Sequence, residues 1–266
     1  MSAHQKTRIL ILGGGFAGLH AAIHLDGTLA RKPNVEITLI NRENYFLFTP
    51  MLHEVAASDL DLTNIVNPVR QLLRRVNLFA GEVEAIDLDR QRVRVSYGFD
   101  HHHHDLPYDH LVIGLGSITN FFNLPGLADR ALTMKSLGDA IYVRNRLISL
   151  LEEADTECCA DIREPLLTFV VAGGGFAGVE TIAAINDFVR HAVRVYGNLR
   201  EDMLRVVLVH PGPMILPELG EQLGQYAQEK LAQRGVEIRT KTKVSGLTDR
   251  GVELSTGEMI ETKALI

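Results

Sequence analysis

The sequence predicts an α/β protein built from two similar units, and the main observation behind this is a repeated glycine motif. Each copy follows a short apolar run typical of a buried strand, at residues 8–12 and 166–171. The letters GGGFAG are identical in the two copies, at residues 13–18 and 173–178. A run that favours a helix follows each motif. A strand–glycine–helix unit that occurs twice is therefore the basis of the predicted fold.

The glycine spacing indicates what such a unit binds. In the pattern G-x-G-x-x-G, the first glycine allows a tight turn and the second lets a pyrophosphate approach the backbone. The third lets the helix lie close to the strand, and the positive end of the helix then faces the phosphates. The glycines at these positions are Gly13, Gly15 and Gly18 in the first copy and Gly173, Gly175 and Gly178 in the second. We therefore predict two Rossmann-like dinucleotide-binding domains, at residues 1–125 and 126–266.

Composition excludes several other classes of protein. The 266 residues are 46% hydrophobic, which is enough to form two hydrophobic cores. The net charge is −6 and the basic residues form no continuous patch in the sequence, so nucleic acid is not an expected partner. No apolar run approaches the roughly 20 residues that span a bilayer, and the N-terminus lacks the apolar part of a signal peptide. The adjacent Cys158 and Cys159 match no disulfide framework, which favours a reducing compartment.

In the first unit, the pattern predicts a helix to about residue 30 and a strand over 35–40. The polar turn Asn41-Arg42-Glu43 follows about 23 residues after Gly18, where a dinucleotide fold places the residue that meets the ribose. An ordinary polar turn is the alternative. The apolar segment 45–56 has two open interpretations: it lines a flat ring or lipophilic substrate, or it starts a buried helix after Pro50.

The rest of the first unit is predicted to contain a helix, further strands and another buried strand. The pattern predicts a helix over 66–76, strands between 78 and 97, and a buried strand over 109–115 that ends in glycines. The tract His101–His104 resembles a metal-binding tract, but no cysteine or spaced carboxylate cluster accompanies it. A polar hairpin tip is the favoured interpretation, and we expect no metal.

The second unit repeats the order of the first. Asp139 is expected to cap a helix that ends near residue 154. After the second motif, the pattern predicts a helix over 179–195, a strand over 204–209, a helix over 223–233 and a strand over 236–238. Two short strands flank the turn at Thr256-Gly257, and the chain ends in a predicted strand at residues 264–266.

With both motifs placed, the chain resembles the two-dinucleotide-binding flavoprotein disulfide reductase superfamily. Within it, the chain resembles the type II NADH dehydrogenases, which are single-subunit NADH:quinone oxidoreductases. Five segments carry the resemblance: GGGFAGL at 13–19, NYFLFTPMLHEVA at 44–56, YDHLVIGLGSITNFFNLPG at 108–126, GGGFAGVE at 173–180 and GPMILPEL at 212–219. The aromatic-Pro-Leu and LGS-x-TNFF signatures are more specific than the glycine loops. No C-x-x-C follows the first loop, which argues against a dithiol reductase.

The resemblance implies that the first domain binds FAD and the second binds NADH. The loop for the FAD pyrophosphate would consist of Gly13, Gly15, Phe16, Ala17 and Gly18. Around it, Asn41 and Arg42 would meet the adenosine ribose, Val83 would contact the adenine side, and Thr49, Leu115 and Gly116 would lie along the flavin. The NADH loop would consist of Gly173, Gly175, Phe176 and Gly178. The implied reaction is hydride transfer from NADH to FAD, followed by reduction of a membrane quinone without proton pumping.

Two positions of the second unit deserve separate interpretation. The resemblance places Glu180 near the nicotinamide as the candidate catalytic residue, where it would relay a proton or position the ring. The alternative is an acid in the first turn of a helix, where the helix dipole favours it. His210 stands where the family usually presents an acidic residue to the NADH ribose. We therefore expect only a weak preference for NADH over NADPH.

The family continues well beyond residue 266, with a Gly-Asp motif for the flavin, quinone-site residues and an amphipathic membrane anchor. We therefore expect a fragment or a shortened homologue that lacks the C-terminal part. The resemblance implies a cytoplasmic protein, peripheral on the inner face of the membrane, and allows a homodimer. The alternative function is a nucleotide-binding module, or a truncated fragment of such an enzyme, without quinone turnover.

Overall fold

The computed structural model describes residues 6–266, which form two compact units. The first unit runs to Phe48 and includes Ile65–Ile118, and the second consists of Thr49–Asn64 and Thr119–Ile266. The short segment 49–64 therefore packs with the second unit, although it lies between two parts of the first. These units divide the chain by packing. The predicted boundary after residue 125 divides it by ligand and stays a prediction.

A parallel sheet of four strands forms the centre of the first unit. The strands are β1 (Thr7–Leu12), β2 (Val35–Asn41), β5 (Asn77–Ala80) and β9 (His110–Ile113), in the order β5-β2-β1-β9. Leu12 pairs with Ile40 on one side and Ile113 on the other, so the strands end together at one edge. Because β1 is apolar on both of its faces, both faces of the sheet have to be covered.

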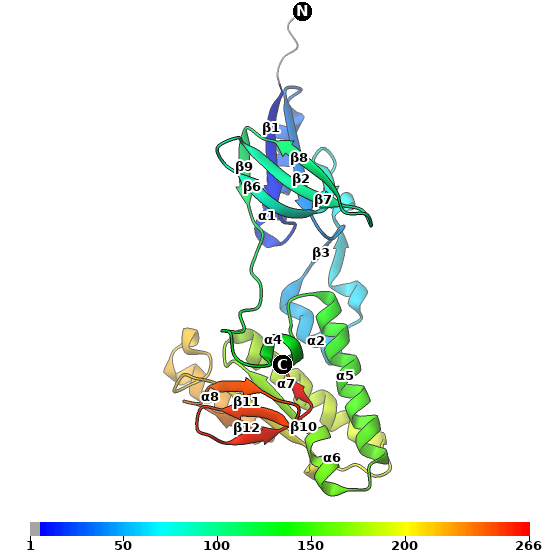
Figure 1. The fold of residues 1–266 in the computed structure, drawn as a ribbon, viewed down its shortest axis with the longest axis vertical. Coiled ribbons are helices and arrows are strands. Elements are labelled where there is room, and N and C mark those ends of the chain that lie inside the picture. Colours follow the sequence, from blue (N-terminus) through cyan, green and yellow to red (C-terminus); the bar gives the residue numbers. More distant parts are fainter. Residues whose placement is uncertain (1–5) are drawn as a thin grey trace, which may run out of the picture. The chain divides into compact units, whose positions relative to one another are not determined.

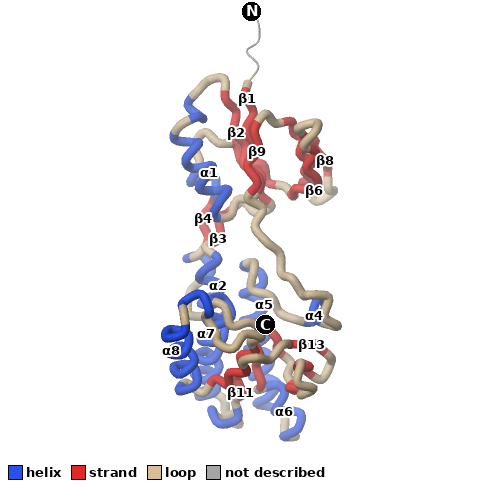
Figure 2. Tube along the Cα trace, turned by 90° about the vertical axis from the view of Figure 1, so that its left-hand side faces the viewer, coloured by secondary structure: helices blue, strands red, loops and turns tan. Residues whose placement is uncertain are grey.

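Each face of this sheet has its own cover. On one face, Leu19 and Ala22 of α1 (Phe16–Gly27) pack against Ile11 and neighbouring side chains. On the other, Val93 and Val95 pack against the face that carries Leu10, Leu12 and Ile40. They belong to an antiparallel sheet of β6 (Glu82–Asp87), β7 (Arg92–Tyr97) and β8 (His102–Pro107). Figure 1 shows this smaller sheet in green, and Figure 2 shows the helix and the smaller sheet on opposite sides of the strands.

The predicted helix over 66–76 is wrong for most of its length. The segment contains β4 (Val66–Pro68), which pairs with β3 (Tyr45–Leu47), and a single turn, α3 (Val69–Leu72). After that turn, three consecutive backbone N–H groups at residues 74–76 donate to one carboxylate oxygen of Asp26. These N–H groups bind Asp26 instead of continuing the helix, and the chain turns into β5.

The second unit has the same plan. Its parallel sheet consists of β10 (Thr168–Ala172), β11 (Arg205–Val209), β12 (Val236–Arg239) and β16 (Ala264–Leu265), in the order β12-β11-β10-β16. An antiparallel sheet of β13 (Val244–Leu247), β14 (Gly251–Leu254) and β15 (Met259–Glu261) covers one face, where Val252 and Ile260 pack near Val170 and Val207. The repeat in the sequence therefore corresponds to a repeat in architecture.

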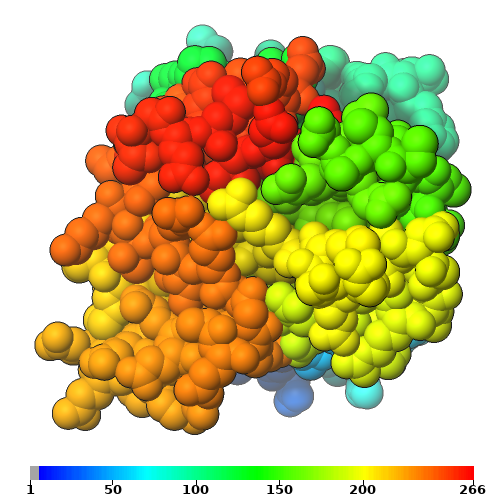
Figure 3. Space-filling model, turned by 90° about the horizontal axis from the view of Figure 1, so that it is seen from below, coloured from blue at the N-terminus to red at the C-terminus, as the bar shows by residue number. Residues whose placement is uncertain are grey.

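Helices complete the second unit. They are α2 (Leu52–Ala56), α4 (Leu127–Arg130), α5 (Leu137–Thr156), α6 (Ala160–Leu166), α7 (Phe176–Ala192) and α8 (Glu221–Gln233). The second unit also contains short 3-10 turns, at Thr49–Met51, Leu62–Asn64, Val193–Val195, Glu201–Met203 and Pro217–Leu219. A further 3-10 turn, Leu29–Arg31, belongs to the first unit. Figure 3 shows residues from the region of α5 and α6 (green) beside residues near the end of the chain (red). Arg146 of α5 donates a hydrogen bond of 3.2 Å to the carbonyl of Lys263.

Two details of these helices bear on the sequence predictions. Ser136, not Asp139, is the N-cap of α5, and Asp139 completes a capping box by accepting from the Ser136 backbone N–H. In α2, Leu52, Val55 and Ala56 are buried and the helix packs against α5 and α7. The interpretation of a buried helix start after Pro50 is therefore correct.

The α/β fold class with two dinucleotide-binding units of the Rossmann type is confirmed by these sheets and their glycine loops. Among residues 6–266, no helix combines the length and apolar character needed to cross a membrane.

Candidate dinucleotide sites

The first glycine loop follows β1 at the edge where the strands of the first unit end. Gly13 has a φ of +92°, a conformation that other residues rarely adopt. A Cβ atom at Gly18 would overlap the carbonyl oxygen of Gly13. The Gly13 N–H donates to the carbonyl of Ile40 at 2.8 Å. The fold itself therefore requires glycine at Gly13 and Gly18, whatever the loop binds.

Gly15 differs from these two glycines. Its φ of −75° suits any residue, and a Cβ atom there would meet no protein atom within 4 Å. Helix α1 begins directly after it, with no side-chain cap and no acidic residue in its first turn. The first N–H groups of a helix have no partners within the helix, so they are free to bind an anion. Open space beside an uncapped helix start fits a pyrophosphate.

Two further residues of this loop, Phe16 and Ala17, are exposed. The Phe16 ring packs edge-on against Phe46 and Phe48, with centroid distances of 5.1 and 5.6 Å. These contacts hold an exposed aromatic side chain at the start of the helix.

Asn41 ends β2 and fixes the loop from the side. Its Oδ1 accepts the Gly14 N–H at 2.7 Å, and its Nδ2 donates to the carbonyl of Glu43 at 2.8 Å. Arg42 lies further out, 3.7 Å from Glu43 and 3.8 Å from Glu82, with its side chain 70% exposed. Asn41 is thus held in place by both ends of its amide, whereas the Arg42 side chain is largely exposed and lies near two carboxylates.

The other predicted FAD residues divide between the units. Leu115 and Gly116 follow β9 at the same edge, and a Cβ atom at Gly13 would lie 3.1 Å from the Leu115 Cα. Val83, in β6, is half-buried in the first core. The structure therefore brings these three residues into the unit that holds the first loop. Thr49 belongs to the second unit, at the start of the segment 49–64.

The second glycine loop repeats the first. Gly173 has a φ of +124°, and a Cβ atom at Gly178 would overlap the carbonyl oxygen of Gly173. A Cβ atom at Gly175 would meet nothing within 4 Å, and α7 starts beyond it without a side-chain cap. Phe176, the first residue of α7, is 48% exposed. This loop also has the space and the free helix start that a pyrophosphate needs.

His210 follows β11 and lies beside this loop. Its Nδ1 accepts the Gly174 N–H at 3.0 Å, and the side chain is half-buried. The resemblance places His210 where the family usually presents an acidic residue to the NADH ribose, which stays a prediction, and the sequence did not indicate this bond to the loop.

Glu180 is the fifth residue of α7, whose first turn contains no acidic residue. The interpretation of Glu180 as a first-turn acid is therefore wrong, because the helix begins at Phe176. Its Oε2 lies 3.7 Å from Nδ1 of His53, whose Nε2 lies 3.9 Å from Glu54. An imidazole between two carboxylates can hold or pass a proton.

Sequence reasoning missed His53 as a functional candidate. The residue stands more than 100 positions before Glu180, inside a segment that follows the first unit's second strand. Only the packing of α2 against α7 brings the two side chains together. No spacing rule in the sequence could have found this pair.

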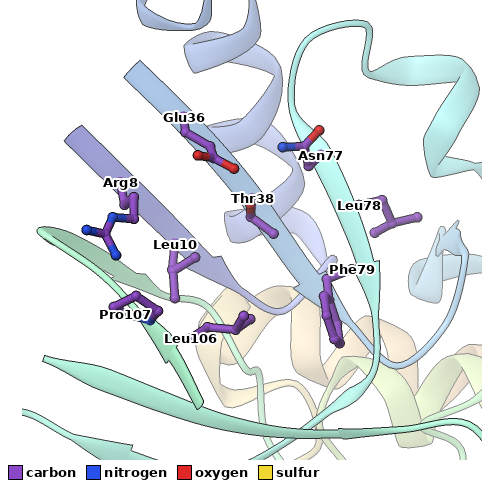
Figure 4. Close-up of a pocket in the computed structure, with 9 residues that line it drawn as sticks. All are labelled: Arg8, Leu10, Glu36, Thr38, Asn77, Leu78, Phe79, Leu106 and Pro107. Atoms are coloured by element: carbon purple, nitrogen blue, oxygen red, sulfur yellow. The ribbon is translucent and has the colours of Figure 1, made fainter. Parts of the chain in front are cut away.

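A cavity of about 340 Å³ in the first unit lies away from this edge. Figure 4 shows Arg8, Glu36 and Asn77 around it, together with Thr38. Arg8, Glu36 and Asn77 stand at the beginnings of their strands, whereas the glycine loop follows a strand end. Dinucleotides bind at the carboxyl ends of parallel strands, so this cavity is not the predicted site.

The histidine tract lies mostly in a strand and not at a hairpin tip. Residues 102–104 belong to β8, and only His101 stands in the turn. His103 pairs with Glu84 at 2.9 Å, and His104 lies 3.1 Å from the Tyr97 hydroxyl. Within residues 6–266, no group of three or more His, Cys, Asp or Glu side chains is arranged to hold a metal.

Sequence comparison finds relatives along almost the whole chain. The family profile described as pyridine nucleotide-disulphide oxidoreductase matches residues 7–266. The type II NADH:quinone oxidoreductase Ndh of Mycobacterium tuberculosis is 34% identical over 252 residues, which cover 93% of this chain and 53% of that protein. The mitochondrial external NADH-ubiquinone oxidoreductase 2 of Saccharomyces cerevisiae is 31% identical, over 90% of this chain and 44% of that protein. The chain spans about half the length of the curated relatives it matches.

Structural comparison gives the same picture of the fold. NDH2 from Plasmodium falciparum, solved in complex with NADH, superposes with a TM-score of 0.91 at 23% sequence identity. The match covers 98% of this chain and 54% of that protein. At this identity the likeness shows a shared fold.

Proposed function

The chain belongs to the pyridine nucleotide-disulphide oxidoreductase family, and from this premise we propose that it carries the two nucleotide sites of a flavin-dependent NADH:quinone oxidoreductase. The first glycine loop binds FAD and the second binds NADH, with NADPH as an alternative donor. The relatives named as NADH:quinone and NADH-ubiquinone oxidoreductases support this proposal.

One observation carries the proposal: the same binding geometry occurs twice. The two GGGFAG loops leave open space at Gly15 and at Gly175, each directly before an uncapped helix of at least 12 residues. A single such loop suits many nucleotide-binding proteins. Two loops in one chain suit a protein that brings a donor dinucleotide and a flavin dinucleotide to one reaction.

The chain's own residues would bind and orient the reactants. The N–H groups that begin α1 and α7 hold the two pyrophosphates, and Asn41 and His210 fix the loops from which these helices start. Bound FAD supplies a ring that can accept a hydride and reduce a quinone. Glu180, with His53 beside it, holds or moves a proton at its Oε2 atom.

The acceptor and the location are part of the same proposal. We infer a quinone acceptor, and therefore a position at the membrane surface, because membrane quinones dissolve in the bilayer. The inner face of the membrane and a homodimer are included in the proposal on the resemblance to the type II NADH dehydrogenases. Fractionation of cells should place the protein that contains this chain with the membranes at low salt. Recovery of all of it in the supernatant would contradict the membrane position.

The absorbance spectrum of the purified chain tests the proposed activity. After incubation with FAD and desalting, we expect a band near about 450 nm that bleaches when NADH is added without oxygen. A water-soluble quinone should then restore the band. A chain that binds NADH but never retains FAD would be a nucleotide-binding module instead. A chain that binds neither nucleotide would contradict the proposal.

A further inference from the structure

The His210 imidazole fills a slot beside the second glycine loop. A Cβ atom at Gly174 would lie 2.7 Å from the His210 Cγ, and one at Gly212 would lie 2.6 Å from its Nε2. The ring is therefore clamped between two backbone segments that have no side chains. From this slot its Nδ1 accepts the Gly174 N–H at 3.0 Å. The bond joins the middle glycine of the loop to the end of β11.

The first unit contains the same bond with a different acceptor. Asn41 ends β2, and its Oδ1 accepts the Gly14 N–H at 2.7 Å. A Cβ atom at Gly14 would lie 2.7 Å from the Asn41 Cγ. In both units, the second of the three consecutive glycines (Gly14 or Gly174) is thus fixed by a side chain at the end of the second strand of the sheet. The two acceptors differ in one respect, because an amide oxygen accepts at every pH and an imidazole nitrogen accepts only when it carries no proton.

We propose that His210 is a positioning residue for the second glycine loop, and that this loop binds a dinucleotide only while the imidazole is neutral with its proton on Nε2. The proposal rests on the proposed function, since it assigns a dinucleotide to this loop. A proton on Nδ1 would place two N–H groups against each other across 3.0 Å. The loop would then move away from His210 and lose the shape that its pyrophosphate needs.

Few titratable side chains lie on the segments that pack against His210. The glycine loop and residues 211–215 contain no titratable side chain. The end of β12 and the following turn, which hydrogen-bond to His210 and Gly212, carry the cations Arg239 and Lys241. Arg239 is paired with Glu237 and Glu258. Among the described residues, no carboxylate lies within ion-pair distance of the His210 ring, whose side-chain hydrogen bond is the one to the Gly174 N–H.

NAD⁺ binding measured by calorimetry at pH 7.5 and pH 5.5 tests the proposal. Lowering the pH favours the protonated form of an imidazole, which has no acceptor nitrogen left for the Gly174 N–H. We expect the Kd of the wild-type chain to rise about tenfold between these two pH values. His210→Asn introduces the acceptor that the first unit uses, and its Kd should change less than about twofold. An equal pH effect in both proteins, or none in the wild type, would overturn the proposal.

NADP⁺ and an NMR titration complete the test. If a protonated ring merely attracted the 2′-phosphate, NADP⁺ would bind more tightly at pH 5.5, which is the opposite of our expectation. Imidazole ¹⁵N–¹H spectra of the ligand-free chain should place the proton on Nε2 at pH 7.5, and the Gly174 amide signal should follow the His210 titration. A proton on Nδ1 would refute the positioning role. Failure of NAD⁺ to bind at any pH, with these spectra as expected, would refute only the proposed function.

Discussion

At the scale of single residues, the glycines of each loop have separate tasks that the sequence pattern alone could only suggest. Gly13 and Gly18 are needed by the fold, because a side chain at either would strike the backbone. Gly15 is surrounded by open space, so the fold does not explain it. The pattern predicted the tasks of Gly13 and Gly18 correctly because they follow from backbone geometry, and the task of Gly15 in binding a pyrophosphate stays a prediction. It could not predict the bonds from Asn41 and His210 to the loops, which depend on the end of another strand.

Glu180 gives the first prediction at this scale. In the FAD-loaded chain, Glu180→Gln should lower kcat for NADH-dependent reduction of a soluble quinone by about 10²-fold, because a carboxamide cannot carry a proton. His53→Gln should act in the same direction, and the double variant should be no slower than the slower single variant, since the two side chains act together. Steady-state rates from pH 6 to pH 9 measure this.

Glu54→Gln is the matched control, because Glu54 also lies beside His53 but does not belong to α7. It should keep most of the activity, and the FAD content of all four variants should equal that of the wild type. A Glu180→Gln chain with unchanged kcat throughout this pH range would remove Glu180 from the proton path.

At the scale of elements, the sequence predicted the strands and long helices well and the short connections poorly. The strands were predictable because runs such as residues 166–171 are apolar on both faces. The segment 66–76 was not, because its conformation depends on Asp26, some 50 positions earlier. The membership of 49–64 in the second unit was equally hidden. It follows from the burial of Leu52 and Val55 by helices that come much later in the chain.

Asp26 gives a prediction at the scale of elements, about the stability of the first unit. Burial alone would raise the pKa of its carboxyl, but the N–H groups of Arg74, Arg75 and Val76 outweigh burial, so the pKa lies below its usual value. Because the pKa of Asp26 is lower in the folded chain than in the unfolded chain, the ionised carboxylate stabilises the folded state. This stabilisation is fully present above the unfolded pKa of about 3.9 and is lost as the pH falls through the folded pKa. Asp26→Asn should destabilise the first unit by about 1.5–3 kcal/mol at pH 7. The difference from wild type should shrink below about pH 4.

Urea unfolding followed by circular dichroism measures this difference. Asp105→Asn is the control in the same unit, because Asp105 also has a lowered pKa, caused by its hydrogen bond with Arg94, but is exposed. Its effect should be much smaller. If Asp26→Asn and Asp105→Asn cost the same at pH 7, the Asp26 carboxylate does not hold the turn before β5.

At the scale of the whole molecule, the chain contains two copies of one plan. Each unit has a four-stranded parallel sheet, a GGGFAG loop, a helix after the loop and a three-stranded antiparallel sheet. Both loops have open space at their Gly15 or Gly175 position and an uncapped helix start, so these features do not decide which loop takes FAD and which takes NADH. That assignment rests on the resemblance of the flanking segments to the type II NADH dehydrogenases, and it is the central claim to test.

The most direct test places one substitution at the equivalent position of each loop. Gly15→Val and Gly175→Val each put a branched side chain into open space, so both chains should fold with little change in melting temperature. The test measures how much FAD each chain retains after desalting, and then whether NADH bleaches the flavin absorbance in the absence of oxygen. Gly15→Val should lose at least about tenfold in FAD affinity, a cost of about 1.4 kcal/mol. Gly175→Val should retain FAD like the wild type but fail to be bleached by NADH. Equal loss of FAD in both variants, or loss only in Gly175→Val, would contradict the assignment of FAD to the first loop and NADH to the second.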